Sequence, residues 1–347
     1  SMIGIFFIGK TRFKDLSNSL EKINLKKKVL TIGLILIGLS GLSVHAQEHA
    51  HDQKSAIDFD SIIQADAFSI DHAEKFGQLI IQDAGGRMKP ANTFSSELLR
   101  KVSKSDTYNG LNSDQVLLSI MNNPAVWYNV PMIFLKRGND SLRKLTGQGI
   151  KEKYAPLLSF FDSQGNYKLA PQLEAAYRAS VPNQFQKDFI ELDRRVNLLY
   201  SALEGKIMRI FPLPNDENNK WVSFPELNEA NFTGKDSLYV RNILPLYFQS
   251  LRLAQQDKDY DQANDLLESI YGFQKKFGSE VLPSEDRVKA EITYNKYDIF
   301  KKLYSWYIYA GTLFFIVLLI QIFKSNKVIS VLVGGFKAIM VLLFVLH

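Results

Sequence analysis

The sequence of 347 residues contains no cysteine. It can therefore form no disulfide and no thiolate metal site, and no cysteine can act as a nucleophile. It also contains no nucleophile elbow, no HExxH pair and no glycine-rich phosphate loop. Without such a pattern, an autonomous enzyme would need a site assembled from distant residues, so we expect this chain not to be catalytic by itself.

Basic residues are abundant, and the net positive charge is concentrated near the ends of the chain. The formal net charge is +6, and seven lysines and arginines against two acidic residues lie between Lys10 and Lys28. Lys324, Lys327 and Lys337 lie in the last segment, which leaves the centre of the chain nearly neutral. Nucleic-acid binding requires a basic surface on the folded domain. The distribution therefore predicts no nucleic-acid partner.

The N-terminal segment contains apolar runs on both sides of these basic residues. Residues 1–28 combine the end of an apolar segment with a basic stretch, and residues 29–46 form an uncharged apolar run that ends in small side chains. The second run is either an internal transmembrane helix or a signal-like segment that is cleaved after Ala46. The apolar residues 2–9 favour the helix, because they resemble the end of an earlier membrane segment. Both alternatives stay open.

The C-terminal segment predicts two further membrane elements. Residues 303–323 are uncharged and begin with aromatic side chains that favour the headgroup level, which predicts a transmembrane helix. Residues 324–347 predict a short basic loop and the start of a further membrane helix. Since a lysine at the bilayer centre is costly, we expect a surface-lying start, a helix that begins near Lys337, and an interruption of that helix at His347.

The position of the basic segments predicts the orientation of the chain. Lysines and arginines close to membrane helices favour the cytoplasmic side. With residues 1–28 and the loop after residue 323 in the cytoplasm, residues 47–302 are expected to form an extracytoplasmic domain. The predicted location is a bacterial inner membrane, with the lipid bilayer as a partner and the large domain on the periplasmic side.

The fold class that these patterns predict is mainly α with a minor β component, as a membrane-anchored extracytoplasmic domain flanked by transmembrane helices. Apolar spacings of three and four residues predict helices over 93–102, 112–121, 182–204, 238–254, 260–277 and 284–299. Short apolar runs beside turn residues predict strands over 79–82, 127–135, 207–211 and 221–224. The last helix is expected to run directly into residues 303–323.

One turn between a strand and a helix carries two basic residues. Arg87 and Lys89 either hold an anionic group near the helix N-terminus or belong to a structural turn whose charges face water. No phosphate-loop spacing accompanies them, which favours the structural turn. His72 precedes this turn in a polar helix start, and we expect a structural role for it.

Other polar residues have simple structural interpretations. His45, His49 and His51 have no rigid element to orient them, so a solvated tether is favoured over a metal site. Glu191 and Asp193 are expected to face solvent from a helix. We therefore predict no metal site and no catalytic residue in this sequence.

Four groups of residues, taken in order, carry a resemblance to a known family. They are the segment that reads Gln-Asp-Ala-Gly-Gly-Arg-Met-Lys-Pro from residue 82 and continues to residue 101, Trp-Tyr-Asn-Val-Pro at 127–131, Phe-Pro-Leu-Pro-Asn at 211–215 with Trp-Val at 221–222, and the tyrosine-rich helix at 303–323. In this order they resemble the ResB/CcsA-type system II cytochrome c biogenesis protein, or cytochrome c synthase, of Bacteroidetes. The positions of the first group that match the family pattern are Asp83, Gly86, Arg87, Lys89, Pro90, Thr93 and Glu97.

The resemblance implies a function that the residues alone do not. The family is implied to move haem across the membrane and attach it to apocytochrome c, with histidines as haem ligands and a tryptophan-rich external loop. This chain has only Trp127, Trp221 and Trp306, so we expect the haem-attaching part to lie beyond it. His347 is then the candidate haem ligand, since it would lie within a membrane helix.

Two functions follow as hypotheses. In the first, the chain is part of a system II complex, its external domain is a scaffold or docking domain, and its partners are apocytochrome c and the remaining ResB/CcsA membrane segments. The full-length family is implied to be a cytochrome c haem lyase, with haem as cofactor. The alternative is a membrane-anchored extracytoplasmic sensor or ligand-binding domain.

Overall fold

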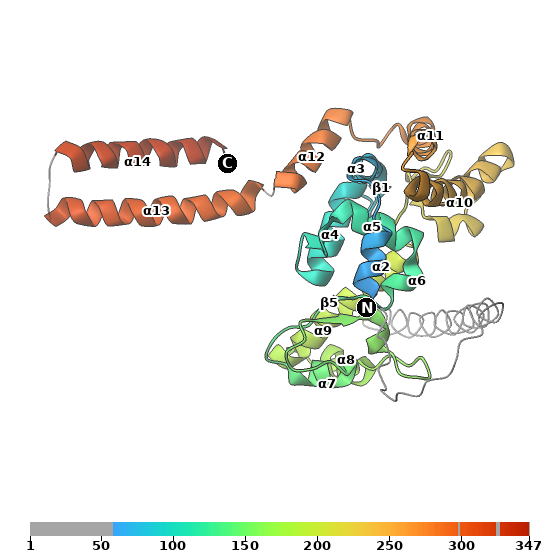
Figure 1. The fold of residues 1–347 in the computed structure, drawn as a ribbon, viewed down its shortest axis with the longest axis horizontal. Helices are drawn as coiled ribbons and strands as arrows, with labels where there is room; N and C mark the ends of the chain where they lie inside the picture. Colours follow the sequence, from blue (N-terminus) through green and yellow to red (C-terminus); the bar gives the residue numbers. More distant parts are fainter. Residues whose placement is uncertain (1–57, 298, 324–326, 347) are drawn as a thin grey trace, which may run out of the picture. The chain divides into compact units, whose positions relative to one another are not determined.

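The computed structural model describes residues 58–297, 299–323 and 327–346 (Figure 1). The chain forms two compact units, Ser1–Leu282 and Pro283–His347. The predictions for residues 1–28, for the helix or signal at 29–46 and for the histidines at 45, 49 and 51 lie outside the described residues. The same holds for His347.

The described part of the first unit is mainly helical, as predicted. It contains, in order, α2 (Phe59–Ala65), α3 (Ile70–Gly77), β1 (Ile80–Gln82), β2 (Met88–Pro90), α4 (Ala91–Ser103), β3 (Thr107–Tyr108), β4 (Leu111–Asn112), α5 (Ser113–Asn122), α6 (Pro124–Trp127), β5 (Pro131–Phe134), α7 (Asp140–Thr146), β6 (Tyr154–Pro156), the 3-10 helix η1 (Leu157–Phe160), α8 (Ala170–Arg178), α9 (Gln184–Leu203), β7 (Phe211–Pro212), β8 (Trp221–Val222), the 3-10 helix η2 (Phe224–Asn228), α10 (Gly234–Asp257) and α11 (Asp261–Gly278).

Helix boundaries follow from capping side chains. The Asn112 side chain accepts a hydrogen bond from the backbone N–H of Gln115, whose own side chain accepts from the backbone N–H of Asn112, and α5 begins there. Asn183 starts α9 in the same way. Gly205 closes the end of α9 with a φ of +69°, a left-handed conformation that glycine adopts without strain.

Within the described residues, the β component consists of four antiparallel two-stranded ladders, β1 with β2, β3 with β4, β5 with β6 and β7 with β8. The strand predicted over 127–135 is too long, because Trp127 ends α6 and the strand begins at Pro131. Pro124 begins α6, where its missing N–H costs nothing. Of the strand predicted over 207–211 only Phe211 lies in β7, whereas the strand predicted over 221–224 is confirmed as the shorter β8.

An apolar cluster fills the described part of the first unit. The largest fully buried side chains of the described residues include Trp127, Trp221 and Tyr247. The helices predicted over 238–254 and 260–277 are confirmed as α10 and α11, which pack against each other. The end of α11 approaches β8 so closely that a Cβ on Gly278 would lie 2.5 Å from Cζ2 of Trp221. Two of the three tryptophans are thus core residues.

The second unit consists of α12 (Glu285–Tyr297), α13 (Ile299–Phe323) and α14 (Lys327–Leu346). Two of these helices are long and apolar enough to cross a membrane, over Lys302–Ile322 and Lys327–Val345. They lie side by side and pack against each other (Figure 1). The Phe314 and Phe336 rings are 6.1 Å apart. The prediction that this last helix begins near Lys337 is wrong, since α14 is already continuous from Lys327.

Candidate functional site

The family-like residues form a hairpin that leads into α4. β1 and β2 pair antiparallel, with Ile81 opposite Lys89. The turn between them is closed by Asp83, whose Oδ1 accepts hydrogen bonds from the backbone N–H groups of Gly85 (2.8 Å) and Arg87 (3.0 Å). Gly86 completes the turn with a φ of +85°. The hairpin fixes where the following polar residues enter the protein.

Lys89 is buried in this hairpin rather than directed at a ligand or at water. Its Nζ lies 3.1 Å from Oε2 of Glu97 and 3.6 Å from Oδ2 of Asp83, and only 5% of the residue is exposed. The expectation that both basic charges of the turn face water is therefore wrong for Lys89, while Arg87 is exposed. Two carboxylates already pair with the buried Lys89 charge, so Lys89 is not available to bind an external anion.

These contacts shift the acidity of both carboxyl groups. Partial burial alone would raise the pKa of Asp83, but backbone N–H groups and the Lys89 charge outweigh it and lower the pKa. Burial likewise opposes the effect at Glu97, where Lys89 and Lys101 lower the pKa. Both groups are thus held as carboxylates, which suits an ion-pair network and not a general acid.

Asp114, in the first turn of α5, is a buried acid that the sequence did not reveal, and it is bound by side chains of α4. Asn92 Nδ2 donates to Asp114 Oδ2 at 2.7 Å, and Ser95 Oγ donates to Asp114 Oδ1. Burial raises the pKa of Asp114, although these two hydrogen bonds favour the carboxylate form. A Cβ on Gly77 would lie 2.7 Å from Asp114 Oδ2, so α3 packs directly on the group. Asp114 thus joins α3, α4 and α5.

Gln82 and Gln274 connect the hairpin to the other end of the domain. Gln82 Oε1 accepts from the backbone N–H of Trp221 at 2.7 Å. The fully buried Gln274 of α11 donates to the carbonyls of Ile80 (2.8 Å) and Ile210 (3.0 Å) and accepts from the N–H of Ile80. The family-like hairpin therefore leads into α4 and is hydrogen-bonded to α11 and β8.

His72 is also a structural residue, as expected. It is 1% exposed, and its Nδ1 and Nε2 each lie 2.9 Å from a partner, Asn264 Oδ1 and the Tyr247 hydroxyl. Burial lowers the pKa of His72, the nearby Lys75 charge lowers it further, and the Asn264 hydrogen bond opposes the effect. Both ring nitrogens are engaged, so His72 is no ready haem ligand. Residues 58–297, 299–323 and 327–346 hold no group of three or more potential metal ligands.

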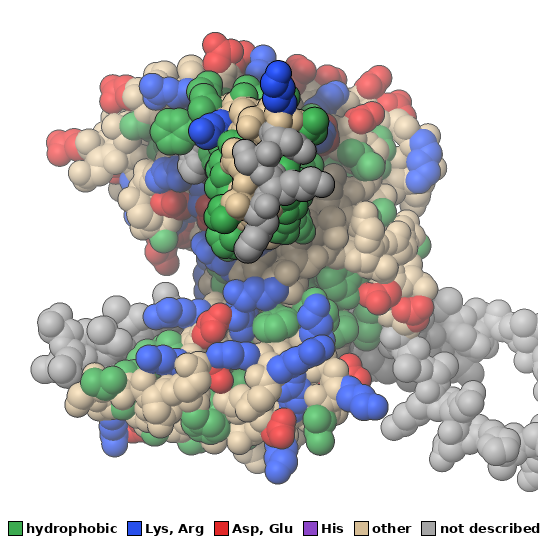
Figure 2. Space-filling model, turned by 90° about the vertical axis from the view of Figure 1, so that its left-hand side faces the viewer, with side chains coloured by type: hydrophobic (Ala, Val, Ile, Leu, Met, Phe, Trp, Pro, Cys, Tyr) green, Lys and Arg blue, Asp and Glu red, His purple; other side chains and the backbone are tan. Residues whose placement is uncertain are grey.

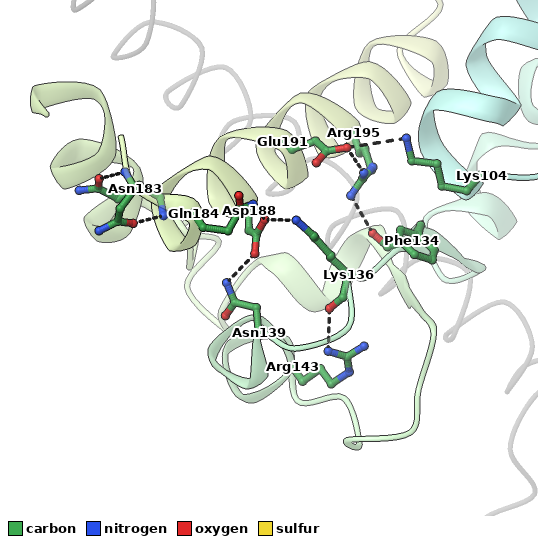
Figure 3. Close-up of polar contacts among 11 residues, drawn as sticks. Lys104, Phe134, Lys136, Asn139, Arg143, Asn183, Gln184, Asp188, Glu191 and Arg195 are labelled. Atoms are coloured by element: carbon green, nitrogen blue, oxygen red, sulfur yellow. Dashed lines mark hydrogen bonds and ion pairs between the residues drawn. The ribbon is translucent and has the colours of Figure 1, made fainter. Parts of the chain in front are cut away.

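A second polar network lies along α9 (Figure 3). Asp188 accepts from Lys136 Nζ and Gln184 Nε2, each at 2.8 Å. Burial would raise the pKa of Asp188, but these donors lower it. The network ties the start of α9 to the chain that follows β5.

Further along α9, Arg195 is buried against β5. Its guanidinium donates to the Phe134 carbonyl at 3.2 Å and to Glu191, and it lies over the Phe134 ring (Figure 3). Lys104 reaches the same Glu191 carboxylate at 3.7 Å. Glu191 thus faces basic partners rather than solvent alone. The expectation that Asp193 faces solvent is wrong, because it is 8% exposed and accepts from the Tyr167 hydroxyl at 3.0 Å.

A polar recess of about 520 Å³ opens where α2, α5 and α10 meet. It is lined by Ala65, Asp66, Asn122, Asn123, Arg252, Gln255 and Gln256. Arg252 donates to Asn122 Oδ1 at 3.4 Å, and Gln255 donates to the Asp66 carbonyl. The charged residues that line the recess are Asp66 and Arg252.

Part of this chain is similar in sequence to a known protein. No family model matches the chain. The chain is similar to protein NrfI of Wolinella succinogenes. The two are 32% identical over 244 residues, which cover 69% of this chain and 26% of NrfI. The chain thus spans about a quarter of the length of this relative.

Proposed function

We propose that this chain is part of a membrane system II cytochrome c biogenesis complex of the ResB/CcsA type. The observation that carries the proposal is the similarity to NrfI over 244 residues, which supports involvement in cytochrome c maturation. The order of the family-like residue groups supports the same assignment. Nearly three quarters of NrfI lies outside the match, which leaves room for the additional membrane segments that the resemblance implies.

In this proposal, residues 47–302 act as an external scaffold or docking domain for apocytochrome c. The contacts support a scaffold, because Lys89, Asp114 and Gln274 direct their polar groups into the protein. The two apolar helices after residue 298 support membrane association. The periplasmic side, the inner membrane and haem ligation by His347 belong to the proposal as well.

Disruption of the gene in its own host tests the maturation role. We expect loss of covalently haem-stained c-type cytochromes, while b-type cytochromes and apocytochrome c persist. Unchanged haem staining would refute the role. A photoreactive residue at the exposed positions Tyr177 and Leu238, on α8 and α10, then tests docking. Capture of apocytochrome c at one position only would support a docking surface, and capture at neither would restrict the domain to a scaffold.

Haem titration of the full chain in detergent tests the cofactor. A Soret shift that disappears in His347→Ala would support a haem ligand at this position. A shift that the variant retains would refute it, and the absence of a shift would remove haem binding from this chain.

The polar recess favours the alternative, an external ligand-binding or sensor domain. Asp66 and Arg252 are suited to a small zwitterion such as a free amino acid. Thermal melting of the full chain with single amino acids tests this. A ligand-dependent rise in melting temperature that is lost in Arg252→Gln would support the alternative, and no rise with any amino acid would count against it.

A further inference from the structure

The first unit is segregated in charge. Residues 131–206, which contain α7, α8 and α9, hold twelve lysines and arginines against eight acidic residues. The other residues between 58 and 282 hold fourteen against twenty. In the space-filling view, Lys and Arg side chains gather over the lower part of the molecule, where α7, α8 and α9 lie (Figure 2). The nearly neutral total of the domain therefore conceals a basic region.

Arg143 is buried in this region and is hydrogen-bonded to two separate segments of the chain. Its guanidinium donates to the carbonyls of Lys136 (2.9 Å) and Glu152 (3.2 Å) (Figure 3 shows the first of these). The backbone N–H of Leu135 donates to the Lys153 carbonyl at 2.9 Å. The residues after β5 and those before β6 therefore lie side by side.

The segments that these contacts join, together with the start of α9 that Lys136 contacts, carry six basic residues, which we call the basic face: Lys136, Arg137, Lys144, Lys151, Lys153 and Lys187. Lys144 follows Arg143 in α7, and Lys187 is next to Asp188, which Lys136 contacts. All six are exposed or half-exposed. The acidic residues among them are Asp140 and Glu152, which are exposed, and Asp188, which is buried and occupied by Lys136. The face thus keeps an excess of positive charge.

Apolar side chains project from the same region. Val181 is 83% exposed and Ile150 is 78% exposed, more than any other large apolar side chain between residues 58 and 282. Ile150 directly precedes Lys151. Tyr177 and Phe185 flank Val181 and are about half exposed. Projecting apolar side chains among lysines are typical of protein surfaces that enter the headgroup region of a membrane.

Two observations favour lipid over an acidic protein as the partner. Five of the six basic residues are lysine, which is depleted in protein interfaces, whereas arginine is enriched there. The same chain also carries two helices long enough to cross a membrane, so a bilayer is present at high effective concentration. Lysine ammonium groups interact favourably with anionic lipid surfaces.

We propose that the basic face binds the phosphate headgroups of anionic phospholipids in the bilayer that carries the apolar helices of the chain, with Ile150 and Val181 inserted at the interface. The proposal does not depend on a role in cytochrome c maturation. It assigns a second membrane attachment to the domain, through α7 and the segments beside it.

The cysteine-free chain allows a direct test. Ile150→Cys is labelled with an environment-sensitive fluorophore, and the full chain is reconstituted in nanodiscs of phosphatidylcholine with or without phosphatidylglycerol. We expect a blue shift and stronger emission only with phosphatidylglycerol, reversed by about 0.5 M salt because exposed charges are then screened. Equal emission in both lipids would overturn the proposal. Emission that responds to polyglutamate but not to phosphatidylglycerol would assign the face to an acidic protein and would also overturn it.

Matched lysine variants show whether the face itself is responsible. Lys144→Gln, Lys151→Gln and Lys153→Gln combined should abolish the lipid-dependent shift. The control combines Lys220→Gln, Lys235→Gln and Lys258→Gln, which remove three exposed lysines outside residues 131–206, and should retain the shift. All six side chains are exposed, and circular dichroism verifies that both variants fold. An equal loss in both variants would refute a specific face.

Discussion

The ammonium group of Lys89 lies 3.1 Å from the carboxylate of Glu97, eight residues further along the chain. Lys89 belongs to β2 and Glu97 to α4, so this pair fixes the direction in which the helix leaves the hairpin. The Lys89 side chain is 6% exposed and that of Glu97 is 31% exposed. The lysine charge is therefore largely desolvated and depends on its two carboxylate partners.

Replacing the lysine with an apolar residue of similar length should destabilise the domain. Lys89→Met leaves Asp83 and Glu97 without their shared partner, and we expect the free energy of unfolding to fall by about 2 kcal/mol, less than for a fully buried pair because Glu97 is partly screened by solvent. The pKa of Glu97 is lowered, so its contribution is present above pH 4.5 and is lost as the pH falls below this value. Urea unfolding at pH 7 and pH 3.5 should show a smaller difference at the lower pH.

Lys101 provides the matched control for this substitution. It contacts the same Glu97 carboxylate at 3.3 Å, but its side chain is 63% exposed. Lys101→Met should therefore change the free energy of unfolding by less than about 0.5 kcal/mol. Equal effects of the two substitutions would show that burial of Lys89 does not contribute.

The local patterns that the sequence predicted correctly are those with short-range causes. The apolar spacing in α9 and its capping residues Asn183 and Gln186 lie within one segment, so the helix is readable without tertiary information. The failures concern partners far apart in sequence. Asp193 is buried because Tyr167 lies against it, and Asp114 is buried because Asn92 and Ser95 enclose it.

The predicted start of the last helix near Lys337 was wrong for a different physical reason. The cost of placing Lys337 in a bilayer concerns the position of its charge, not the ability of its backbone to form a helix. Lysine has a good helix propensity, so α14 is continuous through it. The cost of placing the Lys337 charge in the bilayer therefore could not predict the residue at which the backbone helix begins.

Glycine positions in α11 should respond in opposite ways to alanine. A Cβ on Gly278 would lie 2.5 Å from the fully buried Trp221 ring, so Gly278→Ala should cost about 1–3 kcal/mol. A Cβ on Gly272 would meet no atom within 4 Å, and Gly272→Ala should stabilise the helix by about 0.5–1 kcal/mol. Thermal unfolding of both variants measures the difference. A loss of stability in Gly272→Ala similar to that in Gly278→Ala would contradict the role of Trp221.

His72 should make the stability of the domain depend on pH. Its pKa is lowered in the folded state, so its contribution is fully present above pH 6.5 and is lost as the pH falls below this value, when the unfolded chain takes up a proton that the folded chain does not. One such group can remove at most about 1.4 kcal/mol per pH unit. It is the only histidine between residues 58 and 297.

Unfolding between pH 7.5 and pH 5.5 measures this dependence. His72→Gln should be less stable than the native chain at pH 7.5 but should lose less stability on acidification. The raised pKa of Asp114 acts in the opposite direction, because its charge is suppressed in the folded state and stability is lost as the pH rises through its folded pKa. Comparison of the two chains cancels that contribution. Identical pH dependence would show that His72 does not titrate differently in the two states.

The proposed orientation of the chain can be tested with single cysteines, since the native sequence has none. Asn218→Cys lies in an exposed loop between β7 and β8, and Ser325→Cys lies in the short segment between α13 and α14. If the domain lies on the periplasmic side, a membrane-impermeant maleimide should label residue 218 in intact spheroplasts and residue 325 only after permeabilisation. The basic residues Lys324 and Lys327 favour this arrangement. Labelling of residue 325 but not residue 218 in intact spheroplasts would invert the topology and place the domain in the cytoplasm, where it could not meet an apocytochrome c that has been exported.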